Sequence, residues 1–202
     1  MELNLTDLAW CDLECLAQVR IRPATETDSD AIWRIFHAVI APGDTYAFDP
    51  GMSRRDALAY WFQTGSSTYV AERNGDIVGT YIVRPNQPGL GSHVANAAFM
   101  VSPQARGMGV GRQMGEHCLD EARRLGFRAM QFNFVVSSNQ AAIRLWESLG
   151  FKIVATLPGA FHHSSEGFID VYIMFRSLID QRAITLATGR ARVGRPVQTG
   201  NR

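Results

Sequence analysis

The segment that most constrains the fold is the glycine-rich turn Gln104-Ala105-Arg106-Gly107-Met108-Gly109. It stands between a β-rich run, residues 97–101, and a stretch, residues 110–125, whose apolar side chains recur with helical spacing. Glycine lets the backbone approach a ligand closely, and the first turn of a helix presents unpaired N–H groups with a partial positive charge. The segment therefore predicts a site for an anion such as a pyrophosphate, with Arg106 and Arg112 at its rim. The pattern alone is also compatible with a tight turn that serves close helix packing.

Two common phosphate-binding motifs do not fit this turn. A Walker A loop ends in Gly-Lys followed by Ser or Thr, whereas the chain has Gly111-Arg112-Gln113. A dinucleotide fingerprint has the spacing Gly-x-Gly-x-x-Gly in a first βαβ unit, whereas here Gly107, Gly109 and Gly111 follow one another at every second residue in mid-chain. The turn therefore belongs to another class of anion site.

The rest of the chain alternates between strand and helix patterns. Three helical stripes are predicted. They are Ile32, Ile35, Phe36, Val39 and Ile40 after a cap at Thr27 or Asp28, then Leu58, Trp61 and Phe62 after Ser53, and finally Ala142, Leu145, Trp146 and Leu149. Asn74-Gly75 lies between two β-rich runs and predicts a hairpin. Further strands are predicted at residues 19–23, 94–101, 129–136, 153–157 and 168–175. The predicted fold is therefore α/β (α+β), with helices packed on a mixed central sheet.

Composition limits the class of protein. The 202 residues suffice for one domain with a sizeable core, and the formal net charge of +1 gives no global case for nucleic acid or membrane partners. No apolar run approaches the roughly 20 residues needed to span a bilayer, and the N-terminus lacks the basic start of a secretory signal. The three cysteines cannot all pair and lack zinc-site spacing. The sequence thus predicts a soluble cytoplasmic protein with no metal.

Three regions are predicted along the chain. Residues 1–17 form an N-terminal extension, residues 18–177 form the domain, and residues 178–202 form a basic tail. The tail has five arginines against one aspartate and several glycines, which predicts flexibility. A solvated terminus is its favoured interpretation, and a nucleic-acid role is the alternative.

Two motifs together carry a resemblance to a known family. Gln104-x-x-Gly107-x-Gly109 follows a strand that ends in Met100-Val101-Ser102-Pro103, and Asn139, Ala142, Leu145 and Leu149-Gly150-Phe151 follow further on. This arrangement resembles the GCN5-related N-acetyltransferase (GNAT) family, closest to its small bacterial and fungal members. The resemblance covers the domain and implies a sheet of about six or seven strands with a splayed parallel pair and about four helices. It also implies acetyl-CoA as co-substrate.

The resemblance assigns the acetyl-CoA site to the strand, the turn and the helix that starts at Asn139. Main-chain contacts to the pantetheine arm are expected from Met100 and Val101, and the pyrophosphate is expected on the amides of residues 106–111. Asn139 matches the family asparagine that binds the pantetheine side of the cofactor. The predicted cofactor residues are Met100, Val101, Gln104, Arg106, Gly107, Met108, Gly109, Val110, Gly111, Arg112, Asn139, Ala142 and Trp146.

The catalytic residues are less constrained by the sequence. The family often places a base on the strand before the glycine turn, where the candidates are His93 and Asn96, and only His93 titrates near neutral pH. The usual general acid of the family, a tyrosine, is replaced here by Trp146, which cannot donate a proton. Tyr172 and Tyr46 are the candidate substitutes, and water is the third alternative because a CoA thiolate is a good leaving group. Cys118 lies on an apolar helix face, where burial disfavours a covalent acyl-enzyme.

The acceptor is expected near the loop between the first two helices and the loop before the last strand. Tyr46 and Phe48, with Asp44 beside them, and His162 are the predicted substrate residues. The predicted function is transfer of an acetyl group to a primary amine of a small molecule by direct attack in a ternary complex. An idle acyl-CoA-binding module and a protein or peptide N-acetyltransferase are the alternatives. The predicted partners are acetyl-CoA and the amine, without membrane or nucleic acid, and a homodimer is left open.

Overall fold

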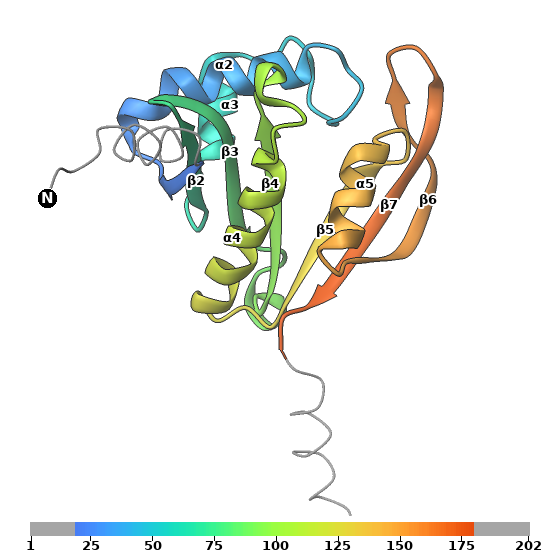
Figure 1. The fold of residues 1–202 in the computed structure, drawn as a ribbon. Coiled ribbons are helices and arrows are strands. Elements are labelled where there is room, and N and C mark those ends of the chain that lie inside the picture. Colours follow the sequence, from blue (N-terminus) through green and yellow to red (C-terminus); the bar gives the residue numbers. More distant parts are fainter. Residues whose placement is uncertain (1–18, 180–202) are drawn as a thin grey trace, which may run out of the picture.

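The computed structural model describes residues 19–179. The predicted extension, residues 1–17, and almost all of the predicted basic tail lie outside the described residues. Within them, seven strands and four α-helices alternate in the predicted order, with short 3-10 helices between them (Figure 1). The elements are β1 Arg20–Pro23, α2 Ser29–Ile40, α3 Arg54–Trp61, β2 Ser67–Arg73, β3 Asp76–Pro85, β4 Val94–Val101, α4 Val110–Arg124, β5 Ala129–Val136, α5 Gln140–Ser148, β6 Lys152–His163 and β7 Gly167–Ser177.

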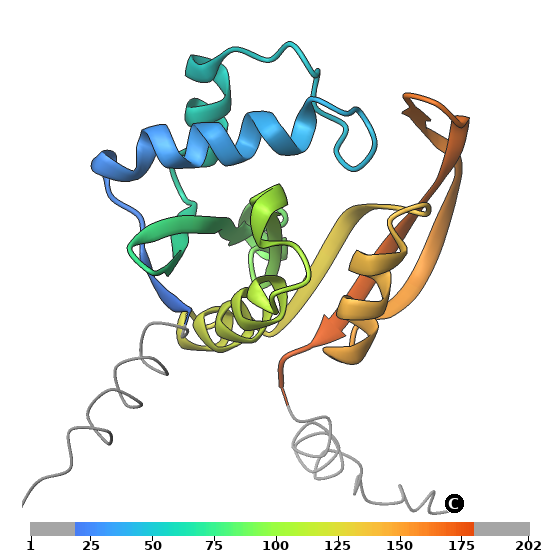
Figure 2. The same ribbon diagram turned by 45° about the horizontal axis from the view of Figure 1, so that its top comes forward.

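All seven strands form one mixed sheet in the order β1-β2-β3-β4-β5-β7-β6. The hairpin predicted at Asn74-Gly75 joins β2 to β3, and every neighbouring pair is antiparallel except β4 with β5. These two parallel strands pair only at their beginning, Val94 with Ala129 and Ala95 with Met130. Beyond Ala95 they diverge, and Figure 2 shows the wedge that opens between them. The predicted splayed parallel pair is confirmed.

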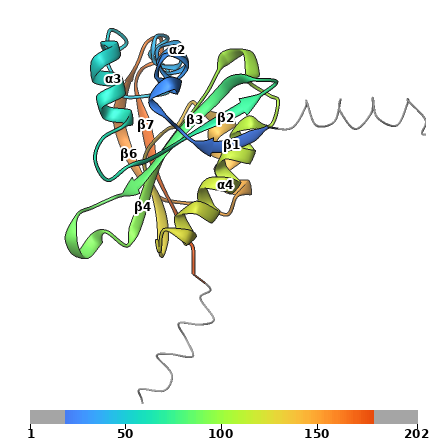
Figure 3. The ribbon, with the colours of Figure 1, turned by 90° about the vertical axis from the view of Figure 1, so that its left-hand side faces the viewer.

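Helices cover both faces of the first half of the sheet (Figure 3). Alternation along β3 explains this, because neighbouring side chains of a strand point to opposite faces. Tyr81 and Val83 pack with residues of α4, whereas Ile82 packs with residues of α2 and α3. The sheet therefore has one hydrophobic core under α4 and α5 and another under α2 and α3, and a third, smaller cluster contains Val136, Phe161 and Val171.

The predicted starts of α2 and α3 are both found, but the predicted side-chain cap is present only in α3. The side chain of Ser53 caps α3 by accepting from the amide of Asp56. Asp28 precedes α2 but does not cap it, because its carboxylate accepts hydrogen bonds from Thr25 and from both terminal nitrogens of Arg22, at 2.8 and 2.9 Å. The Arg22 hydrogen bonds lower the pKa of Asp28 to about 2.

The last strand pair is longer than predicted. β6 was expected to end at Leu157, with His162 and His163 in a loop, but the strand continues to His163 with irregular pairing between Leu157 and Phe161. Pro158 and Gly159 lie within this irregular part, which explains why the sequence suggests an early end. Because adjacent residues of a strand face opposite sides of the sheet, the side chains of His162 and His163 point in opposite directions.

Candidate active site

The glycine turn connects β4 to α4 through a 3-10 turn at Pro103–Ala105. Gly107 and Gly109 both have φ of +77°, a left-handed conformation that disfavours other residues. Gly109 also takes the N-cap position of α4, and no side chain caps the helix. The first-turn amides of α4 therefore keep their hydrogen-bonding capacity, and a Cβ on Gly109 would meet only Gln113 Nε2, at 3.9 Å. Open space and unpaired amides make this turn suitable for an anionic group.

A cavity of about 710 Å³ lies in front of this turn, and we call it the glycine-turn cavity. Most of the predicted cofactor residues line it, namely Met100, Val101, Arg106, Gly107, Gly109, Gly111, Arg112, Asn139 and Ala142. Gln104 and Met108 are exposed outside it, and Val110 is buried in the core under α4. Only the main chain of Val110 is thus available to a ligand.

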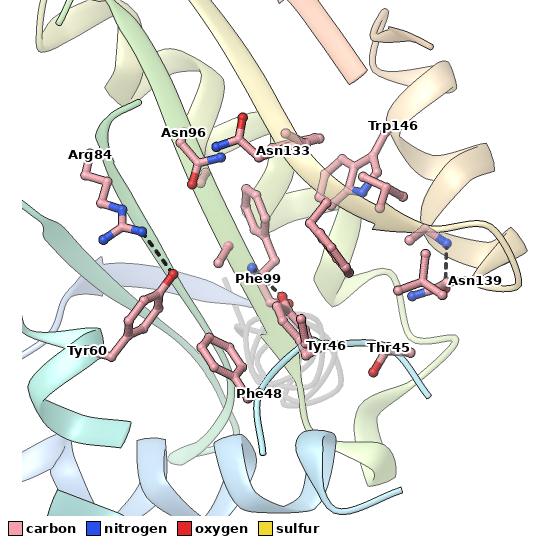
Figure 4. Close-up of a pocket in the computed structure, with 18 residues that line it drawn as sticks. Thr45, Tyr46, Phe48, Tyr60, Arg84, Asn96, Phe99, Asn133, Asn139 and Trp146 are labelled. Carbon is pink, nitrogen blue, oxygen red and sulfur yellow. Dashed lines mark hydrogen bonds between the residues drawn. The ribbon is translucent and has the colours of Figure 1, made fainter. Parts of the chain in front are cut away.

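A second cavity, of about 340 Å³, occupies the wedge between β4 and β5, and we call it the central cavity. Figure 4 shows side chains from the α2–α3 loop, β3, β4, β5 and α5 converging on it. It shares Thr45, Tyr46, Phe99, Asn139 and Ala142 with the glycine-turn cavity, so the two adjoin. A polar pocket lined by Gln63, Asn86, Asn96, Asn133 and neighbouring loop residues adjoins its other end.

The main-chain N–H and C=O groups of β4 turn toward the wedge at alternate residues. Ser102 N–H donates to Val78 on β3, and the carbonyl of His93 accepts from Arg128 at the start of β5. In antiparallel pairing, the main-chain groups of every second residue bond to the neighbouring strand. The N–H and C=O of Met100 therefore point to β3, whereas those of Phe99 and Val101 point to the wedge. The expectation of main-chain contacts from Val101 is consistent with this geometry. The main chain of Met100 faces β3, although Met100 lines the glycine-turn cavity, so its main-chain contact with the cofactor stays a prediction. Phe99 was not among the predicted residues.

The α2–α3 loop is fixed to this strand by Tyr46. Its hydroxyl donates to the carbonyl of Phe99, at 2.6 Å, and accepts from the Phe99 N–H, at 3.1 Å. Desolvation of the hydroxyl raises the pKa of Tyr46, so it stays neutral. Beside it, Asp44 Oδ1 and Thr45 Oγ1 are buried without a hydrogen-bond partner among residues 19–179, and both residues line the glycine-turn cavity.

Comparison with known proteins decides the family. Residues 32–151 match the sequence profile of the Acetyltransferase (GNAT) family. N-acetyltransferase aca1 of Schizosaccharomyces pombe is 33% identical over 151 residues, which cover 66% of this chain and 72% of that protein. The chain belongs to the GNAT family.

Two solved structures agree with this membership. A GCN5-related N-acetyltransferase from Kribbella flavida is 42% identical, with a TM-score of 0.76, and the match covers 79% of this chain and 97% of that one. The structure of yncA, a putative acetyltransferase from Salmonella typhimurium with its cofactor acetyl-CoA, is 27% identical, with a TM-score of 0.72 over 81% of this chain and 96% of that one. This GNAT protein is therefore an acetyltransferase that uses acetyl-CoA.

Acetyl-CoA requires an anion site and main-chain pairing groups, and this chain has both. The first-turn amides of α4 are suited to hold its pyrophosphate, and the wedge-facing main-chain groups of Val101 are suited to pair with its pantetheine arm. Asn139 caps α5 by accepting from Ala142 N–H, at 3.1 Å, so its Nδ2 is left to face the cavities. Among the described residues no group of His, Cys, Asp and Glu is placed to hold a metal ion, and no helix could cross a membrane.

Trp146 of the GNAT domain forms a wall of the central cavity. It is buried and packs its ring against Phe99 and Phe132, with centroids 4.8 and 4.7 Å apart. α4 approaches it closely, since a Cβ on Gly115 would lie 3.2 Å from the indole. Trp146 lines the central cavity but not the glycine-turn cavity. Its predicted contact is therefore limited to the part of the cofactor that enters the wedge.

Of the catalytic candidates His93, Asn96 and Tyr172, the structure brings one to the cavities. His93 is exposed at the start of β4, at the end opposite the glycine turn, and its Nδ1 contacts the carbonyl of Leu90. Tyr172 packs on β7 against the core under α4 and α5. Neither lines a described cavity, and this placement does not favour their predicted roles. Asn96 lines the central cavity, and its Nδ2 donates to the carbonyl of Gln131 where β4 and β5 separate.

The predicted substrate residues divide in the same way. Tyr46 and Phe48 line the central cavity and stack on each other, with centroids 5.6 Å apart. His162 is exposed and stacks on Phe168, whereas its neighbour His163 is buried and lines the glycine-turn cavity with Glu166. The alternation of β6 separates the two histidines, so His163, and not the predicted His162, is the histidine that reaches a cavity.

The sequence reasoning missed several polar or aromatic residues that line the cavities, among them Tyr60, Arg84, Asn86 and Asn133. Tyr60 and Arg84 interact at one side of the central cavity, and Asn133 lies at its polar end (Figure 4). Asn133 accepts from Gln131 Nε2 and donates to Asn86 Oδ1. These residues lie on α3, β3 and β5 and on the segment after β3, so no local sequence motif connects them.

Proposed function

We propose that this acetyltransferase transfers the acetyl group of acetyl-CoA to a primary amine of a small molecule by direct attack in a ternary complex. The observation that carries the proposal is the junction of the two cavities at Phe99 and Asn139. The acetyl donor is proposed to lie along the glycine-turn cavity, with its thioester reaching the wedge. The acceptor then enters from the polar end of the central cavity.

The size and walls of the central cavity support a small acceptor. Its volume of about 340 Å³ lies in the range of small-molecule sites, and the α2–α3 loop covers one side through Tyr46 and Phe48. An extended peptide needs an open groove beside the reacting centre. The cavity therefore favours a small amine over a protein N-terminus.

The chemistry requires an unprotonated amine. An alkylammonium has a pKa near 10, so a proton must leave before the nitrogen attacks the thioester carbon. No carboxylate or histidine lines the central cavity among the described residues, so we propose that water takes this proton. The free Oδ1 of Asn96 is suited to accept a hydrogen bond from the amine and so to orient its lone pair.

Attack develops negative charge on the thioester oxygen. The N–H of Phe99 points into the wedge at the cavity junction, where it donates to the hydroxyl oxygen of Tyr46. This N–H is suited to stabilise the oxyanion when the thioester oxygen takes the place of the Tyr46 hydroxyl. Collapse of the tetrahedral species breaks the carbon–sulfur bond, and the thiolate takes a proton from water because Trp146 has no acidic proton to give. Cys118 does not compete as a nucleophile, since it is buried and desolvation raises its pKa.

The absence of a titratable base in the central cavity, with Trp146 in place of a tyrosine, also favours an idle acyl-CoA-binding module as a second candidate. Calorimetric titration with acetyl-CoA tests the shared premise, and both candidates predict micromolar or tighter binding. Thiol release measured with a panel of small amines and short peptides then separates them. Release that depends on a small amine supports the enzyme; binding without release on any amine supports the idle module.

A further inference from the structure

Arg84 lies near the C-terminal end of β3, between the central cavity and the polar pocket, and lines both. Its guanidinium donates from Nη2 to the hydroxyl of Tyr60, at 2.9 Å, and lies 5.0 Å from the centre of the Tyr60 ring. Figure 4 shows this pair on the side of the cavity opposite Asn139 and Trp146. α3 therefore holds the guanidinium in place while most of its N–H donors remain free.

Arg84 has no anionic partner among residues 19–179. No carboxylate lies within salt-bridge distance of it, whereas the half-buried Arg22 binds both Asp28 and Glu72. Arg84 is partly buried, and a cation that is partly removed from water without a counter-charge raises the free energy of the folded state. A ligand that supplies the counter-charge would be bound preferentially.

The surroundings of Arg84 are otherwise uncharged. Of the described residues that line the central cavity and the polar pocket, Arg84 is the only one with a charged side chain. The other polar groups there are hydroxyls and the amides of Gln63, Asn86, Gln87, Asn96, Asn133 and Asn139. This end of the site is therefore positive, and it attracts an anionic group on the acceptor.

The register of the sheet places this charge beside the reacting centre. Arg84 pairs directly with Asn96 across β3 and β4, and Asn96 precedes the wedge-facing Phe99 by three residues. A guanidinium binds a carboxylate through two parallel hydrogen bonds, so it fixes both the position and the orientation of a small acid. An acceptor held this way at Arg84 would extend its amine toward Asn96 and the cavity junction.

We propose that Arg84 binds the carboxylate of the acceptor and that the acceptor class is amino-acid-like, with an amine and a carboxylate on one small molecule. The inference rests on the proposed function, since it names the acceptor of the same site. Tyr60 acts as the positioning residue that directs the guanidinium.

The test compares L-amino acids with their carboxamides, which differ from them in lacking the negative charge. Initial rates of thiol release give kcat/KM for both series with the wild type, Arg84→Gln, Arg84→Lys and Arg55→Gln. Arg55 is 90% exposed and lines no described cavity, so Arg55→Gln is the matched control for the loss of one arginine. Since charge-assisted hydrogen bonds are strong, Arg84→Gln is expected to lower kcat/KM for the acids by about 10- to 100-fold. Values for carboxamides and the KM for acetyl-CoA are expected to stay unchanged, Arg84→Lys to be intermediate, and Arg55→Gln to match the wild type.

A binding measurement keeps the result independent of turnover. L-amino acids are titrated into protein saturated with CoA, and their affinity is expected to fall in Arg84→Gln. Equal use of acids and carboxamides, or equal losses on both in Arg84→Gln, would overturn the inference, as would a wild type that neither acetylates nor binds any acid. Acid binding that requires Arg84 without turnover would instead uphold the inference and contradict the proposed function. If Arg84→Gln does not fold, Arg84→Met, which keeps the aliphatic stem, replaces it in both assays.

Discussion

The two ends of the β4–β5 wedge are built from different parts of the chain. At the glycine-turn end, most of the predicted contacts come from main-chain groups of one continuous segment, from Phe99 through the first turn of α4, and Asn139 adds a side chain. At the other end, the contacts come from side chains of the α2–α3 loop, α3, β3, β4 and β5. A main-chain site binds what all acyl-CoA molecules share, whereas a side-chain site can vary with the acceptor. The comparison places the common chemistry at one end and the specificity at the other.

Replacement of Gly109 is the strongest way to break this comparison. Gly109→Val forces a β-branched residue into a left-handed conformation and places a side chain where the pyrophosphate is proposed to lie. If two charge-assisted hydrogen bonds are lost, acetyl-CoA affinity should fall by about 100-fold or more in calorimetric titration. Gly126→Val is the matched control, because Gly126 has φ of +86°, open space and a position at the other end of α4. Comparable affinity in both variants would contradict the pyrophosphate assignment.

At the same end, two substitutions of Asn139 distinguish its role as the cap of α5 from its proposed role in cofactor binding. Asn139→Asp keeps the cap of α5 but replaces the free Nδ2 donor with an acceptor, so acetyl-CoA affinity should fall by about 10-fold without loss of stability. Asn139→Ala should show a similar loss of affinity and in addition lower the free energy of unfolding by about 1 kcal/mol. Calorimetric titration and chemical denaturation measure the two effects. An aspartate variant with wild-type affinity would reduce Asn139 to a helix cap.

Tyr46 connects the two ends, and its removal should act mainly on stability. Tyr46→Phe deletes both hydrogen bonds to Phe99 and should lower the free energy of unfolding by about 1–2 kcal/mol. The folded state raises the pKa of Tyr46 above its ordinary value of 10.0, so the unfolded state releases its proton first and wild-type stability falls as pH rises above 10. In Tyr46→Phe, the free energy of unfolding should fall less steeply above pH 10 than in the wild type. Denaturant unfolding at pH 8 and at pH values above 10 measures both effects, and an unchanged slope with pH would show that Tyr46 is not desolvated.

His93 should produce the smallest effect. It lies outside the cavities, and no carboxylate or histidine among the described residues lines the central cavity. The acidic limb of the pH dependence of kcat/KM should therefore follow the ammonium pKa of the acceptor, and His93→Ala should leave it in place. Rates measured with two acceptors of different amine pKa check this. A limb that stays fixed between acceptors and moves in His93→Ala would restore His93 as the base.

The sequence predicted the glycine-turn end far better than the acceptor end, and the reason is local. The strand, turn and helix around Gly107 and Gly109 are contiguous, so spacing and glycine content reveal them together. Which main-chain groups of β4 face the wedge, those of Phe99 and Val101 rather than those of Met100, depends on the strand that pairs with β4, and this is a property of the whole sheet. The element order and the splayed parallel pair followed from patterns within each segment and from the family resemblance.

At the acceptor end, sequence reasoning lacked any local signal. Arg84 and Asn133 are 49 residues apart and meet only because β3, β4 and β5 are neighbours in the sheet. His162 and His163 differ by one residue, and only the true end of β6 tells which side each faces. A histidine can serve as a general base, but the position of His93 at the start of β4 removes it from the wedge.

The most direct test of the account is the initial-rate pattern with acetyl-CoA and an amino acid varied together. Direct attack across the cavity junction predicts intersecting lines in double-reciprocal plots, release of CoA thiol that requires the amine, and an acetylated amino acid identified by mass spectrometry. Parallel lines, together with acetyl label that remains on the protein in the absence of acceptor, would contradict it.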